Sequence, residues 1–62
     1  MIKVGTKVQA LFPKAGRIVK GVVVYQHETR NPYSADRVAY GVRWSAGGTG
    51  DGWTRDDLTV IE

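Results

Sequence analysis

Cysteine is absent from this chain of 62 residues, and it contains a single histidine, His27. Without cysteine the fold cannot be stapled by disulfide bonds, and zinc sites built from thiolates are excluded. One histidine also excludes a site built from several imidazoles. We therefore expect no metal and no other cofactor. Stability must come from a compact apolar core, with pairing into a homodimer as a further possibility.

Long apolar runs are missing as well. None approaches the ~20 residues that are needed to span a bilayer. The first residues also lack the apolar segment of a secretory signal peptide. These features predict a cytoplasmic protein with no membrane partner. A chain this short buries only about 60% of the surface that its unfolded form exposes, so residues 1–62 are expected to form a single domain with one small core.

Acidic residues are scarce in most of the chain, although the net charge is only +3. Residues 1–43 hold eight Lys and Arg residues against two acidic ones, whereas residues 44–62 hold one Arg against four acidic residues. Such polarity can steer an anionic partner toward one face. The alternative is a solvated surface whose charge is merely uneven.

Alternation of apolar and polar residues predicts strands along most of the chain, and no segment shows a sustained helical period. The expected strands cover residues 2–12 with an interruption at Gly5-Thr6, then residues 17–26, 38–44, 53–55 and 59–61. A glycine loop over residues 45–52 precedes the fourth strand. A single helical turn at residues 56–58, with Asp56 as its cap, precedes the fifth.

The same alternation assigns the faces of the strands. In the first strand the buried parity holds Ile2, Val4, Val8, Ala10 and Phe12. In the third, Val38, Tyr40, Val42 and Trp44 point inward, and Ala39, Gly41 and Arg43 point outward. Gly21 inside the second strand predicts a bulge or sharp bend of the kind that small barrels need at their corners. These features predict an all-β fold, a five-stranded SH3-like small barrel with one short helical turn before the last strand.

Several motifs resemble the SH3-like superfamily, which includes Tudor, chromo-barrel and KOW domains. They are Gly5-x-x-Val8, Lys20-Gly21-x-Val23, Tyr40-x-Val42-Arg43-Trp44 and Asp57-Leu58-x-Val60. The chain looks closest to small actinobacterial and phage-type proteins that carry a YxVRW-like strand. The resemblance implies a binding module, because members bind nucleic acid, methylated side chains, proline-rich peptides or other protein surfaces. The plasmid-encoded type of dihydrofolate reductase is similar in outline, but its Val-Gln-Ile-Tyr strand is replaced here by GWTR, so its activity is not carried over.

The loop sequence Gly48-Thr49-Gly50-Asp51-Gly52 raises the question of whether it cradles a phosphate or only turns the chain. Phosphate-binding glycine loops direct backbone N–H groups at the anion, usually from the N-terminus of a helix. Here a strand is expected after the loop, no Lys-Ser/Thr pair follows, and Asp51 would repel a phosphate. The loop is therefore predicted to be a hairpin connection.

Catalysis is not expected. His27 and Glu28 are adjacent, but no nucleophile or cleft accompanies them. The neighbouring carboxylates of Asp56 and Asp57 more simply cap the helical turn than hold a metal. The sequence therefore predicts a protein that is not an enzyme.

The aromatic residues suggest a contact surface. Trp44 has the parity of the inward row and is assigned to the core. Trp53 follows the glycine loop and can point either way. It can pack in the core, or it can be partly exposed as a platform for bases or a cation.

The leading functional hypothesis is nucleic-acid binding through a basic face, with little sequence specificity. The residues expected to contact nucleic acid are Lys3, Lys7, Lys14, Arg17, Lys20, Arg30, Tyr33, Arg37 and Arg43, with Trp53 as a possible aromatic contact. The alternative is a protein-interaction module. It would be a phage or accessory factor that docks on a host protein through residues 27–37 and an exposed aromatic ring.

Overall fold

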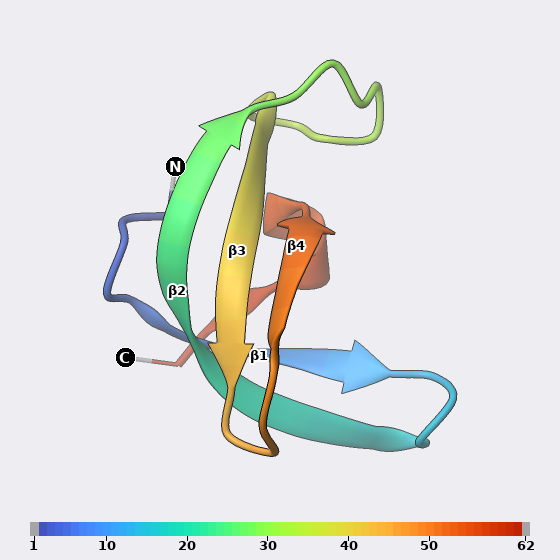
Figure 1. Cartoon of the computed structure of the whole chain (residues 1–62). Coiled ribbons are helices and arrows are strands. Elements are labelled where there is room, and N and C mark those ends of the chain that lie inside the picture. Colours follow the sequence, from blue (N-terminus) through green and yellow to red (C-terminus); the bar gives the residue numbers. More distant parts are fainter. Residues whose placement is uncertain (1, 62) are drawn as a thin grey trace.

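The computed structural model describes residues 2–61, which form a five-stranded antiparallel sheet with the strand order β4-β3-β2-β1-β5 (Figure 1). The elements are β1 (Lys7–Phe12), β2 (Arg17–Glu28), β3 (Val38–Trp44), β4 (Thr49–Trp53), the 3-10 turn η1 (Arg55–Asp57) and β5 (Thr59–Val60). The sequence prediction of an all-β fold, with five strands and a helical turn before the last strand, is confirmed. Within residues 2–61 no ladder joins β4 to β5, so the sheet is not closed and the predicted barrel is not confirmed.

The long strand β2 bends and takes part in both halves of the sheet, as Figure 1 shows. Its residues 17–22 pair with β1, and its residues 21–28 pair with β3. The register irregularity lies between Val23 and Tyr25 rather than at Gly21, where the sequence predicted it. Glycine is needed at position 21 for a different reason. A Cβ there would lie 2.7 Å from the carbonyl oxygen of Arg43 and 2.8 Å from the Trp44 ring, so the two strands could not approach so closely.

The core lies on the inner side of the bent sheet. Its buried members are Ile2, Val8, Ala10, Val19, Val23, Val38, Tyr40, Val42, Trp44 and Leu58. The four residues of β3 that were predicted to point inward are all among them, including Trp44. Two half-buried rings, Phe12 and Trp53, pack against this cluster and extend it toward the β1–β2 hairpin.

Alternation assigned three residues to the wrong environment. Val4 was expected to be buried but is 55% exposed. The chain leaves strand geometry there, since Gly5 has φ 93° and β1 begins only at Lys7. Ala39 and Gly41 were expected to be exposed but are buried. The ring of Tyr25 lies over Gly41, where an added Cβ would come within 2.2 Å of it.

Several boundaries differ from the prediction, and β2 runs two residues further than expected, to Glu28. β4 begins at Thr49, so the turn between β3 and β4 is much shorter than the predicted loop. Trp44 N–H donates to the carbonyl oxygen of Gly48 across this turn (3.0 Å), which confirms that the glycines turn the chain. The residue at the N-cap of the helical turn is Thr54 rather than Asp56. The Asp57 carboxylate accepts from the Thr54 N–H (3.4 Å) and from its hydroxyl (2.8 Å). The last strand ends one residue early.

A hydrogen-bond network around Tyr40 ties the chain start to the base of the 29–37 loop. The fully buried Tyr40 accepts from the Ile2 N–H (3.0 Å) and donates to an Asp36 carboxylate oxygen (2.5 Å). Burial raises the pKa of Tyr40, and the Asp36 carboxylate raises it further. Burial works against ionisation of Asp36 as well, but hydrogen bonds from Tyr40, Val38 and Ser34 together lower its pKa.

Candidate nucleic-acid interface

Three of the predicted basic residues come together on the outer face of the sheet. Arg43 of β3 pairs with Val22 of β2, and Val22 pairs in turn with Lys7 of β1. Lys20 precedes Val22 by two residues, so its side chain leaves the same face of β2. All three basic residues are exposed. The pairing of neighbouring strands thus places side chains together that are up to 36 residues apart in the sequence.

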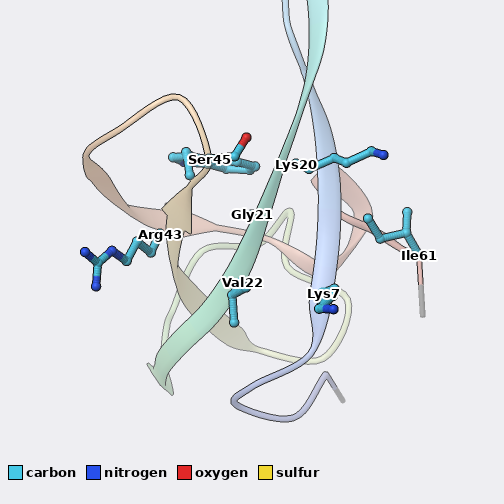
Figure 2. A pocket seen from close by; sticks show the side chains of 8 residues that line it. Lys7, Lys20, Gly21, Val22, Arg43, Ser45 and Ile61 are labelled. Carbon is cyan, nitrogen blue, oxygen red and sulfur yellow. The ribbon is translucent and has the colours of Figure 1, made fainter.

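A shallow depression of about 320 Å³ lies among these residues. Val22 and Ile61 give it an apolar lining, and Lys7, Lys20 and Arg43 border it. We call these five residues the basic groove. Figure 2 shows Arg43 extending on one side of β2 and Lys20 on the other, with Val22 between them. None of the described residues that line the depression is acidic, so the groove offers positive charge beside an apolar surface.

The other predicted contact residues lie elsewhere. Lys3 is exposed before β1. Lys14 and Arg17 lie at the tip of the β1–β2 hairpin, and Tyr33 lies on the 29–37 loop together with the arginines at positions 30 and 37. The hairpin and the loop extend from different ends of the molecule in Figure 1. The nine residues therefore do not form one continuous face, and a role for these six stays a prediction.

Trp53 packs into an aromatic cluster. Its ring centroid lies 4.9 Å from that of Trp44 and 5.4 Å from that of Phe12. The side chain is half-buried, which leaves part of the ring at the surface. Its contact with a partner stays a prediction.

A second polar cluster, on the same outer face, was not foreseen. His27 of β2 lies with Nε2 3.2 Å from an Asp51 carboxylate oxygen and with Nδ1 3.0 Å from the Glu28 carbonyl oxygen. Both ring nitrogens thus face acceptors. The Glu28 carbonyl and then Asp51 raise the pKa of His27, whereas the Gly52 N–H and His27 lower the pKa of Asp51. The Tyr25 ring stacks on His27 at a centroid distance of 6.4 Å.

The sequence contained a partial signal for the residues that were missed. Val22 has the same parity as Lys20, but the bulge expected at Gly21 left the faces of the second strand unassigned. No face was assigned to Ile61 in the last strand. The partnership of His27 with Asp51 had no sequence signal. The two residues are 24 positions apart and meet only because β2 and β4 both flank β3.

Within residues 2–61 no group of three or more His, Cys, Asp or Glu side chains could hold a metal ion. The same residues include no helix that is long and apolar enough to cross a bilayer. No protein-family model matches this chain, and comparison with the curated proteins and with the solved structures gives no significant match.

Proposed function

We propose that this protein is a non-catalytic module that binds nucleic acid through the basic groove. The observation that supports the proposal is the placement of Lys7, Lys20 and Arg43 around the apolar surface of Val22 and Ile61. Cationic side chains bind phosphates and release counterions, which drives binding without regard to sequence. The apolar lining would contact sugars or base faces between the phosphates.

The spacing of the groove fits a phosphate backbone. Arg43 and Lys7 lie on strands that flank β2, so their backbones are two strand spacings apart, or about 10 Å. A span of this size allows the cationic side chains to contact neighbouring phosphates of one nucleic-acid strand. Arg43 can hold phosphate oxygens with its planar fork, and the lysines act as point charges. Such contacts position a nucleic acid but read little sequence.

We also propose that the sheet is an opened variant of an SH3-like small barrel. The strong bend of β2, the return of β5 to pair with β1 and the 3-10 turn before β5 support this assignment. A fold of this kind hosts many binding functions, so it adds little to the choice of partner. The proposed binding partner is therefore inferred from the basic groove.

Binding of labelled single- and double-stranded DNA and RNA at about 50 mM salt tests the proposal. The Lys20→Gln and Arg43→Gln variants are expected to bind about threefold to tenfold more weakly, because each loses one phosphate contact. The proposal confines the phosphate contacts to the groove, so Lys14→Gln, which removes the same charge at the hairpin tip, is the matched control. Absence of binding by the wild type would sink the proposal. An equal loss in Lys14→Gln would show that overall charge, and not the groove, is responsible.

A second candidate function is docking on a partner protein, and two observations favour it. Tyr33 on the 29–37 loop is 83% exposed, and Leu11 and Ile18 form a cross-strand pair on the β1–β2 hairpin with each side chain 59% exposed. Exposed aromatic and aliphatic side chains often anchor protein interfaces. A pull-down from a host lysate with and without nuclease separates the two functions. Captured proteins that survive nuclease treatment and are lost with Tyr33→Ala would favour docking.

A further inference from the structure

The two ends of the 29–37 loop are joined at its base. Thr29 N–H donates to the carbonyl oxygen of Arg37 at 2.9 Å. This bond places Arg30, the next residue along the chain, beside Arg37. Both arginines line a depression of about 460 Å³ together with Thr29, Asn31 and Ser34.

Both guanidinium groups are available to a ligand. Arg30 and Arg37 are exposed, and within residues 2–61 neither forms an ion pair. No acidic residue lines the depression. Glu28 borders a neighbouring depression of about 350 Å³ that the same two arginines share, but it makes no ion pair with either. Two arginines that form no ion pair within residues 2–61 therefore line one polar hollow.

The backbone of Arg37 is held in an unfavourable conformation. Its φ is 57°, and no other non-glycine residue of the described chain has a positive φ. The Ser34 hydroxyl, which bonds to both the N–H and the carbonyl oxygen of Val38, helps to fix this turn, and Asp36 accepts from the same N–H. Glycine or asparagine would adopt this conformation at lower cost. The presence of an arginine at this strained position is explained if its side chain binds a ligand.

We propose that the 29–37 loop is a binding site for one phosphate group, with Arg30 and Arg37 as its charged ligands. Guanidinium groups match phosphate because their N–H donors lie in a planar fork that can bond two oxygens at once. A phosphate monoester has three terminal oxygens and close to two charges, so it can engage both arginines. Thr29 and Asn31 line the same hollow and add neutral polar groups.

The site is separate from the basic groove and does not rest on the proposed function. Val22 in the groove and Glu28 at the start of the loop are six residues apart on β2, which is about 20 Å measured along the bent strand at ~3.3 Å per residue. The phosphate could belong to a free ion or to the end of an oligonucleotide, and these sources are distinguished by separate arms of one experiment.

In the first arm, inorganic phosphate is titrated into ¹⁵N-labelled protein at ionic strength matched with chloride. Amide signals of Thr29, Asn31 and Ser34 are expected to shift and saturate. Arg30→Gln and Arg37→Asn should weaken the response at least about tenfold, because each loses a charge-assisted pair. Asparagine is chosen at position 37 because it tolerates the left-handed backbone and keeps the loop folded. Arg17→Gln is the matched control and should respond as the wild type does.

The second arm compares one oligonucleotide with a 5′-phosphate and with a 5′-hydroxyl. A preference for the phosphorylated form that disappears in Arg37→Asn but persists in Lys20→Gln supports the site and identifies a terminal phosphate as the source. Equal affinities, together with a saturable response to inorganic phosphate, support the site with the free ion as the source. The proposal is overturned if phosphate shifts do not saturate, if they persist in both arginine variants, or if acetate produces them at the same concentrations.

Discussion

At the scale of single residues, the fold depends on a few buried polar groups that have partners. The hydroxyl of Tyr40 is fully enclosed, yet it donates to Asp36 and accepts from Ile2. A buried polar group without a hydrogen-bond partner costs more free energy than a typical hydrogen bond contributes, because burial has also removed its hydrogen bonds to water. Removing the Tyr40 hydroxyl therefore also takes one hydrogen-bond partner from Asp36 and from Ile2.

Tyr40→Phe is expected to lower the free energy of unfolding by about 1–3 kcal/mol, because the Asp36 carboxylate and the Ile2 N–H both lose a partner. Chemical denaturation measures this directly. Tyr33→Phe removes the same hydroxyl from an exposed ring and should leave stability unchanged. A Tyr40→Phe variant as stable as the wild type would show that the network is not formed in solution.

His27 and Asp51 make stability depend on pH in a defined direction. The pKa of His27 is raised in the fold. Its contribution to the free energy of unfolding is therefore complete below the unfolded pKa of about 6.5, and it is lost as the pH rises through the higher folded pKa. The pKa of Asp51 is lowered, so its contribution is lost as pH falls through that lower value. The wild-type Tm should decline relative to His27→Gln as the pH rises above about 6.5. A constant difference from pH 6 to pH 9 would contradict this pairing.

At the scale of elements, alternation predicted most of the sheet but not its local exceptions. The inner face of β3 was predictable, because four apolar residues share one parity. The burial of Gly41 was not, because the cover is the Tyr25 ring from a neighbouring strand. The fourth strand was predicted at residues 53–55, but β4 covers Thr49–Trp53. The TGDGW sequence has a poor strand propensity, and pairing with β3 overrides it. The bulge after Val23 also leaves no signal in the sequence.

Gly41→Ala should destabilise the protein by about 1–3 kcal/mol, because the new methyl group would overlap the Tyr25 ring. The cost should shrink strongly in a Tyr25→Ala background, where the space above position 41 is open. A double-mutant cycle followed by thermal unfolding measures this coupling. Additive effects of the two substitutions would show that the ring does not cover the glycine.

At the scale of the whole molecule, the sequence predicted positive charge but not its arrangement. Eight basic residues precede position 44, and no pattern in the sequence shows which of them meet. Only the strand order and the register place Lys7 and Arg43 on either side of Val22. The bend of β2 directs the hairpin tip and the 29–37 loop to different ends, which divides the remaining charges among separate surfaces (Figure 1).

The salt dependence of nucleic-acid binding tests the basic groove most directly. For three phosphate contacts, the logarithm of the association constant should fall with the logarithm of salt concentration with a slope of about −3 on duplex DNA. The Lys20→Gln/Arg43→Gln double variant should bring the slope to about −1, because two fewer counterions are released, whereas Lys14→Gln should leave it unchanged. A slope near zero for the wild type, or the same slope for the wild type and the double variant, would contradict binding through the groove.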